Sequence, residues 1–128
     1  MEFEIRTSER VQFLDISSKV GELISIDNGI VLVYTPHTTT GIFINENEPN
    51  LLSDIKRKLE QLVPRGAGYK HDYQEGNADS HIKSCLIGNS VIIPVENGKL
   101  KLGTWQSVFF AEFDGPRRRR IIVREIGE

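Results

Sequence analysis

Residues 90–102 read SVIIPVENGKLKL, and this stretch decides the class of fold. Two runs rich in strand-forming residues, Ser90–Val95 and Lys99–Leu102, flank the tripeptide Glu96-Asn97-Gly98. Asn-Gly between two such runs is the strongest short-range signal of a β-hairpin. The stretch therefore predicts an antiparallel pair of strands.

Strand signals continue on both sides of this hairpin. Downstream, Gln106–Phe113 and Arg119–Glu125 are separated by Asp114-Gly115-Pro116. Upstream, alternating or β-branched runs predict four more strands, at Glu2–Arg6, Val11–Ile16, Ile30–Tyr34 and Ile42–Ile44. The continuous β-branched run that ends at Tyr34 is typical of a strand in the centre of a sheet.

Two helices interrupt the strands. Residues 50–62 carry leucine and isoleucine at helical spacing, with charged residues on the other side. Pro49 or Asn50 can begin this helix, and Pro64 closes it. Asp79 or Ser80 caps a second, shorter helix that ends at Gly88, and a short helical stretch follows Ser17-Ser18. We therefore expect one α+β domain over residues 1–128, with a largely antiparallel sheet or closed barrel and two helices.

Composition narrows the function classes. The net charge is −2 and the isoelectric point is near 5.9, which argues against a dedicated nucleic-acid binder. The basic run Arg117–Arg120 begins a predicted strand, where alternate side chains face opposite ways and form no single patch. The single cysteine, the charged N-terminus and the absence of a long apolar run favour a cytoplasmic protein without membrane contact.

All three histidines lie in short polar clusters rather than in apolar runs. His37 is in TPHTTTG, His71 is in YKHDY, and His81 is in NADSHIKS. Imidazole is the commonest metal ligand and the usual acid–base group near neutral pH. Three histidines that converge from separate segments would form a metal site with an open coordination position. His71 and His81 lie in or next to the long polar loop Arg65–Asp79, and loops of this length in compact domains are usually functional or disordered.

The residues around these histidines suggest roles, each with a structural alternative. Thr38, Thr39 and Thr40 and their backbone amides could cradle an anion, or they could satisfy loose backbone groups in a turn. Asn45 and Glu46 continue a strand on the His37 side. Glu48 fits a helix cap better than a site.

The helix that carries His81 could add one further metal ligand beside that histidine. Its dipole favours a neutral imidazole in the first turn, which is the form that binds a metal. Cys85 lies four residues on, on the same helix face, and is either a further ligand or a core residue. Asp72 is next to His71 in sequence, and neighbours rarely orient each other, so we expect Asp72 to serve another group of the site.

The last third of the chain adds one aromatic and two charged candidates. Trp105, before Gln106, could stack on a ring, close a pocket, or lie in the core or an interface. Glu112 interrupts an apolar strand face, so this acid is either paired or functional. Arg117 follows Asp114-Gly115-Pro116 and could clamp a phosphate or a carboxylate. No generic metal, phosphate or dinucleotide motif is present.

Taken together, these clusters resemble the YjbQ family, also called UPF0047, over nearly the whole chain. The resemblance rests on segments in this order: His37-Thr38-Thr39, Asn45-Glu46-Asn47, His71-Asp72, Ser80-His81-Ile82-Lys83-Ser84, Gly103-Thr104-Trp105-Gln106, and Glu112 with the arginine-rich strand start. Asp114-Gly115-Pro116-Arg117 is one version of the family's last motif. Cys85 falls where members can carry serine, which weakens it as a ligand.

The resemblance implies a barrel-like α+β sandwich, a homotrimer and a secondary thiamine-phosphate synthase activity. That activity is a transfer that joins a pyrimidine diphosphate to a thiazole phosphate. A divalent metal, with zinc as the leading candidate, would neutralise the leaving pyrophosphate. The expected site consists of His37, His71 and His81 on the metal, Glu112, Glu46 and Asp72 in catalysis, and Thr38, Thr39, Thr40, Asn45, Lys83, Ser84, Trp105, Gln106 and Arg117 on the substrate.

Two other functions remain open at this point. A trimer that binds a phosphorylated metabolite without chemistry would use Thr38–Thr40, Lys83 and Arg117. A metal-dependent hydrolase would use the same histidines with a metal-bound water, and Glu112 or Glu46 as the base. The leading expectation is a metal-dependent enzyme that acts on a small phosphorylated compound.

Overall fold

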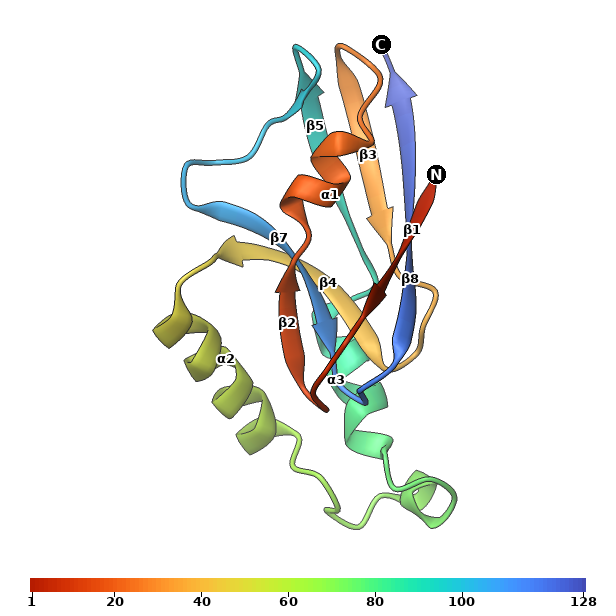
Figure 1. Cartoon of the computed structure of the whole chain (residues 1–128). Helices are drawn as coiled ribbons and strands as arrows, with labels where there is room; N and C mark the ends of the chain where they lie inside the picture. The colour runs from red at the N-terminus through yellow and green to blue at the C-terminus, as the bar shows by residue number, and fades with distance from the viewer.

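The computed structural model describes all of residues 1–128, which fold into two antiparallel sheets with helices packed around them (Figure 1). The larger sheet has the strand order β1-β8-β3-β5-β6 and the smaller one β2-β7-β4. The strands of the larger sheet are β1 (Glu2–Arg6), β8 (Arg118–Gly127), β3 (Gly29–Tyr34), β5 (Ser90–Glu96) and β6 (Lys99–Leu100). Those of the smaller sheet are β2 (Gln12–Asp15), β7 (Gln106–Glu112) and β4 (Thr40–Glu46).

The predicted strands and their antiparallel arrangement are confirmed. The hairpin of β5 and β6 turns at Asn97, which has a φ of 53°, and Gly98, which has a φ of 74°. The run that ends at Tyr34 is central, because β3 pairs with both β5 and β8. The fold is therefore antiparallel and α+β, as the strand pattern predicts, and its sheet is curled, as the family resemblance implies.

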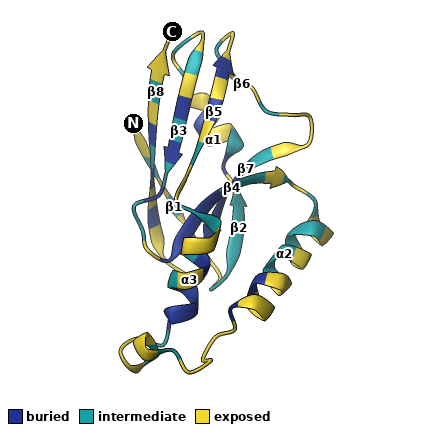
Figure 2. Ribbon diagram, turned by 180° about the vertical axis from the view of Figure 1, so that it is seen from behind, coloured by how far each residue is buried: buried dark blue, intermediate teal, exposed yellow.

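The core lies between the two sheets. Apolar residues from both sheets and from α1 (Ser17–Glu22) form one buried cluster, which includes Val20, Val31, Val33, Phe110 and Ile121. The buried residues follow the strands, whereas α2 (Pro49–Leu62) is mostly exposed or half-buried (Figure 2). Only Leu59 of α2 is buried, so this helix contributes little to the core.

The helices differ from the expectation in three ways. First, α1 is a third helix, where the sequence indicated only a short helical stretch. Second, the polar loop contains one turn of 3-10 helix, η1 (Lys70–Tyr73). Third, α3 (Ala78–Ile87) has Asn77 as its N-cap instead of Asp79 or Ser80, which lie inside its first turn. Glu48 does cap α2, because its carboxylate accepts the Leu51 N–H.

A close approach joins α3 to the smaller sheet. The Ser84 hydroxyl donates to the Thr40 carbonyl, and the Ile42 N–H donates to the Gly88 carbonyl at 3.0 Å. A Cβ on Gly41 would lie 2.7 Å from the Ile87 side chain and 3.0 Å from the Gly88 carbonyl oxygen. Glycine at position 41 therefore permits the contact that sets α3 beside the start of β4. No helix in the structure is long and apolar enough to span a bilayer.

Candidate functional site

Two adjoining hollows lie between α3, the loop from β3 to β4, and the start of β8. Both are lined by Pro36, His37, Thr38 and His81. The charged hollow, about 330 Å³, adds Thr39, Glu75, Asn77, Asp114, Arg117 and Arg119. The neutral hollow, about 480 Å³, adds Tyr34, Thr35, Ser84, Cys85, Gly88 and Asn89. His37 and His81 therefore stand where one hollow opens into the other.

Threonine hydroxyls hold the loop that carries His37. The hydroxyls of Thr35 and Thr40 lie 2.8 Å apart and are buried. Thr40 also donates to the His37 carbonyl at 3.1 Å, and Thr35 accepts the His37 N–H at 3.4 Å. Thr35 and Thr40 thus act as the structural alternative predicts, by satisfying backbone groups of a turn. Thr38 is exposed and lines both hollows.

The His37 ring is neutral and oriented. Burial lowers its pKa from 6.5, and the positive charges of Arg119 and Arg120 lower it further. The Arg120 N–H donates to Nε2 of His37 at 2.9 Å. A neutral imidazole that accepts at one nitrogen carries its proton on the other, so Nδ1 of His37 is a donor.

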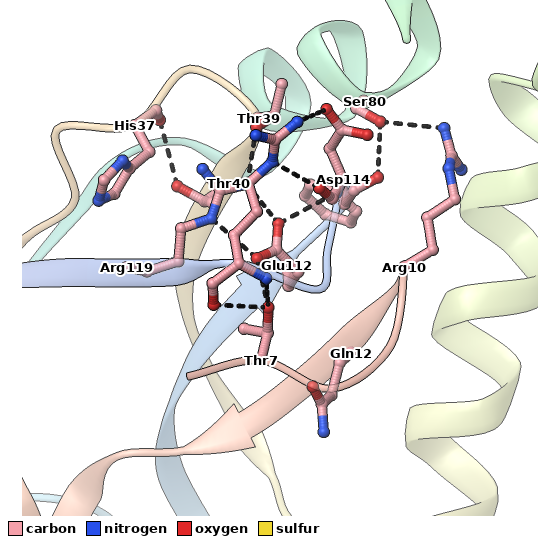
Figure 3. Close-up of polar contacts among 12 residues, drawn as sticks. Thr7, Arg10, Gln12, His37, Thr39, Thr40, Ser80, Glu112, Asp114 and Arg119 are labelled. Carbon is pink, nitrogen blue, oxygen red and sulfur yellow. Dashed lines mark hydrogen bonds and ion pairs between the residues drawn. The ribbon is translucent and has the colours of Figure 1, made fainter. Parts of the chain in front are cut away.

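A buried ion pair supports this end of the molecule (Figure 3). Glu112 has no solvent exposure, and Arg119 is 6% exposed. Nε and Nη2 of Arg119 donate to the two carboxylate oxygens of Glu112, and Nη2 also donates to the Thr39 hydroxyl at 2.9 Å. Glu112 further accepts from the Thr7 hydroxyl and from the Asp114 N–H. Glu112 is therefore paired, and it positions Arg119.

Two guanidinium groups line the charged hollow in fixed positions. Nε and Nη2 of Arg117 donate to the carbonyl and the carboxylate of Asp114, at 2.8 and 3.0 Å. Arg119 is held by Glu112 in the same manner. In both residues Nη1 makes no hydrogen bond within the chain. Each arginine thus keeps a free donor for an anion in the hollow.

Asn77 also lines the charged hollow, and its side chain has an acceptor without a partner. Its amide nitrogen donates to the carboxylates of Asp114, at 2.8 Å, and of Glu75, at 3.3 Å. Because carboxylates only accept, these two bonds define which end of the amide is nitrogen. Its oxygen, Oδ1, is buried and accepts no hydrogen bond. A buried acceptor without a donor has a free energy penalty, which a bound donor would remove.

The structure brings two of the three histidines into contact. The ring centroids of His71 and His81 lie 4.9 Å apart in an edge-to-face arrangement, and His37 shares both hollows with His81. No three His, Cys, Asp or Glu side chains lie together as a metal ion requires. Nδ1 of His37 carries a proton, so it has no lone pair for a metal. As arranged here, the residues do not fit a three-histidine metal centre, and that centre stays a prediction.

Asp72 and Lys83 lie outside the hollows. Asp72 accepts the Ala78 N–H at 2.9 Å, which stabilises the start of α3. Lys83 is 2% exposed, and its ammonium group donates to Asp79 and Glu60. Burial raises the pKa of Asp79, but hydrogen bonds from Lys83 and Arg10 outweigh burial and leave that pKa below its ordinary value. Lys83 thus neutralises a buried carboxylate and lines neither hollow.

The remaining predicted residues lie at the far end of β4 and β7. Asn45 pairs with Ser107 and Glu46 with Gln106, whereas Thr40 pairs with Glu112. Six residues along a strand span about 20 Å, so Glu46 lies far from the two hollows, which adjoin the start of β4. Trp105 is 72% exposed and lines neither hollow. Of the predicted side chains, His37, Thr38, Thr39, His81, Ser84 and Arg117 share the cleft.

Arg119 is the main functional residue that the sequence analysis missed. The strand alternation could have indicated Arg119. Positions 119, 121 and 123 share one face of β8, and Ile121 and Val123 are buried. A charged residue on an apolar face needs a partner, which is the reasoning already applied to Glu112. Asn77 and Asn89 were also missed, and no local pattern distinguishes them from ordinary loop residues.

The whole chain matches a known family. The profile described as "UPF0047 protein YjbQ-like" covers residues 1–128. The chain belongs to the UPF0047, YjbQ-like family. A UPF0047 protein of Archaeoglobus fulgidus is 55% identical over 98% of this chain and 100% of its own length. The UPF0047 protein YugU of Bacillus subtilis is 40% identical, over 97% of this chain and 96% of its own.

Solved structures of similar proteins share the fold. A hypothetical protein of Aeropyrum pernix K1 superposes with a TM-score of 0.96 at 41% identity, covering 100% of this chain and 98% of that one. A YbjQ-like protein of Sulfolobus solfataricus has a TM-score of 0.97 at 34% identity, covering 100% of this chain and 96% of that one. Both agree with the family membership and with the curled antiparallel fold.

Proposed function

We propose that this UPF0047 protein is an enzyme that acts on a small phosphorylated compound in the cleft formed by the two hollows. One observation carries the proposal. Arg117 and Arg119 are each held through Nε and Nη2, each keeps Nη1 free of hydrogen bonds, and both line the hollow that His37 and His81 also line. Guanidinium groups held in this way form strong, oriented hydrogen bonds to phosphate oxygens.

His81 is the proposed acid–base group. Its ring makes no hydrogen bond within the chain and lies at the opening between the hollows. Nε2 of His37 is occupied by the Arg120 N–H, so His37 serves as a donor through Nδ1 rather than as a base. Arg117 and Arg119 would stabilise negative charge that develops on phosphate oxygens. Glu112 acts through Arg119, as a positioning residue.

Thiamine-phosphate synthesis is the named candidate reaction, from the resemblance of the motifs to the family. In that transfer, the arginines would hold the phosphate oxygens and His81 would move a proton. A divalent metal, zinc first, remains a prediction through which no step is derived. The homotrimer is likewise a proposal. A trimer would give Asn45, Glu46, Trp105 and Gln106, which are remote in one chain, a possible place in a neighbour's cleft.

Turnover and binding test the enzymatic proposal together. We would measure pyrophosphate release from a pyrimidine diphosphate with a thiazole phosphate, and phosphate release from a panel of phosphomonoesters. We expect His81→Ala to lower kcat by about 10²- to 10⁴-fold, the usual contribution of a general acid–base group. We expect Arg117→Ala to raise KM about tenfold, since one charged hydrogen bond is lost.

The chain offers a matched control for the arginine. Arg118→Ala removes the same charge one residue away, where the side chain is exposed and lies 3.8 Å from Glu4. This variant should keep the wild-type KM. Full turnover in His81→Ala would overturn the proposed chemistry. Saturable phosphate binding without any product would instead support the non-catalytic binding protein.

Metal content separates the metal-dependent mechanisms. Wild type and His81→Ala would be compared by inductively coupled plasma mass spectrometry after incubation with zinc, manganese and magnesium. Near-stoichiometric metal that is lost in the variant would support the predicted site and a hydrolase with a metal-bound water. Such a hydrolase would need another base, because Glu112 is fully paired and Glu46 lies at the far end of β4.

A further inference from the structure

The charge of the cleft is divided between its two halves. The charged hollow contains two arginines and the acids Asp114 and Glu75. The neutral hollow contains no Asp, Glu, Lys or Arg, although it is the larger of the two at about 480 Å³. His37, which both share, is kept uncharged by burial and by Arg119 and Arg120. A ligand that fills the whole cleft must match this division.

We propose that the substrate is a phosphate ester whose organic part is uncharged and polar. Its phosphate would occupy the charged hollow and its organic part the neutral hollow, with the ester bond between His37 and His81. This inference rests on the proposed function and adds the substrate class to it. This placement of the phosphate and of the organic part follows from the lining residues, because His37 and His81 line both hollows and therefore lie where the two hollows meet.

Desolvation disfavours a charged organic part. A charged group that enters the neutral hollow loses hydration and finds no opposite charge among the lining residues. An uncharged polar group loses less hydration and finds hydrogen-bonding partners in this hollow. Tyr34 and Asn89 both line this hollow, and neither the Tyr34 hydroxyl nor the Asn89 side-chain amide makes a hydrogen bond within the chain. Both groups can donate and accept, so they suit a hydroxyl, a carbonyl or a ring nitrogen.

Size agrees with a single ring. The neutral hollow falls within the range of about 300–1,000 Å³ that small-molecule sites usually occupy. A sugar or one heterocycle fits this space. Inorganic phosphate can occupy only the charged hollow, so the affinity difference between phosphate and its esters measures the contribution of the neutral hollow alone.

Isothermal titration calorimetry provides the comparison. The ligands are inorganic phosphate, three esters with an uncharged organic part (glucose 1-phosphate, ribose 5-phosphate and thymidine 5′-monophosphate), and O-phosphoserine, whose organic part is charged. We expect at least one of the three esters to bind about tenfold more tightly than phosphate, the gain of one or two well-placed neutral hydrogen bonds. O-phosphoserine should bind no more tightly than phosphate.

Variants of residues in each hollow test whether the tighter binding of the ester arises in the neutral hollow. Tyr34→Phe and Asn89→Ala should remove the preference for the ester and leave the affinity for phosphate unchanged. Arg117→Ala should weaken phosphate and ester by the same factor. The inference is overturned if no ester binds more tightly than phosphate, or if the preference persists in the Tyr34→Phe/Asn89→Ala double variant. Absence of binding by phosphate and by all esters would overturn the proposed function itself.

Cys85 supplies an independent readout. It is the only cysteine in the chain, it is exposed, and it lines the neutral hollow but not the charged one. Saturating ester should therefore slow the alkylation of Cys85 by iodoacetamide several-fold, whereas saturating phosphate should leave the rate unchanged. Equal protection by the two ligands would show that the organic part does not enter the neutral hollow. The Cys85→Ser variant controls for alkylation elsewhere.

Discussion

Glu112 and Glu46 are acids at opposite ends of the same pair of strands, β7 and β4, and their surroundings differ completely. Glu112 has no solvent exposure and accepts hydrogen bonds from Thr7, Arg119 and the Asp114 backbone. Glu46 is only partly buried and makes no side-chain hydrogen bond or ion pair. The sequence presents both as candidate catalytic acids.

The comparison shows that burial and partners, not residue type, define the two ends. At the Glu112 end, α3 packs against β4 and the Glu112 carboxylate is fully buried, so a charge there needs a partner. The pairing holds Arg119 against the cleft. At the Glu46 end, the carboxylate makes no bond within the chain, and Glu46 pairs with Gln106, which follows the exposed Trp105. The Glu112 end therefore holds hydrogen-bond donors toward the cleft, whereas the Glu46 end is an accessible surface.

The largest effect should come from removing Glu112. Glu112→Ala leaves the Arg119 charge buried without its partner, and we expect a loss of about 3–5 kcal/mol of unfolding free energy. Glu46→Ala is the matched control, expected within about 0.5 kcal/mol of wild type. Urea denaturation followed by circular dichroism measures both. Equal stability of the two variants would break the comparison between the strand ends.

Substitution of Lys83 tests whether buried charges on α3 also depend on their partners for stability. Lys83→Met removes one partner of the buried Asp79 carboxylate but leaves the Arg10 guanidinium at 3.1 Å. Because a second cation remains, we expect a smaller loss of unfolding free energy, about 2 kcal/mol. Additional replacement of Asp79 by Asn should recover part of that stability. If the double variant is less stable than Lys83→Met, the loss arises from packing rather than from charge.

The pH dependence of the unfolding free energy tests whether the cleft at the Glu112 end keeps His37 neutral. Burial and nearby arginines lower the pKa of His37 in the folded state below 6.5. The unfolded chain therefore binds the proton more readily, so the stability due to neutral His37 is present above pH 6.5 and is lost as pH falls through 6.5 toward the folded pKa. Thermal unfolding between pH 7.5 and 5 should show this decline, reduced in His37→Asn. Identical slopes in both proteins would contradict it.

Trp105 gives the smallest expected change in stability. With 72% of its surface exposed, Trp105→Ala should alter the unfolding free energy of a single chain by less than about 0.5 kcal/mol. Light scattering coupled to gel filtration would measure the subunit count of the same variant. A lower subunit count than that of wild type, with unchanged chain stability, would assign the accessible end to the subunit contact. An unchanged subunit count would assign Trp105 another role.

The strand pattern predicted most of the fold and part of the site. Alternation and Asn97-Gly98 specify the strands and their antiparallel pairing, because these signals are local. The sequence also identified His37, His81 and Arg117, because unusual polar residues stand out against apolar runs. It misassigned the cap of α3, since Asn77, Asp79 and Ser80 are all good capping residues and only the chain path selects among them.

The sequence by itself determined the elements, the family and the polar residue types available for chemistry. Only the tertiary structure decided that Arg119 faces the cleft while Lys83 is buried beside Asp79. It also decided that the cleft has one charged and one neutral half. The physical reason is that hydrogen bonding and desolvation depend on which groups surround a side chain. Those groups come from segments far apart in sequence, as Thr7 and Glu112 do, 105 residues from one another.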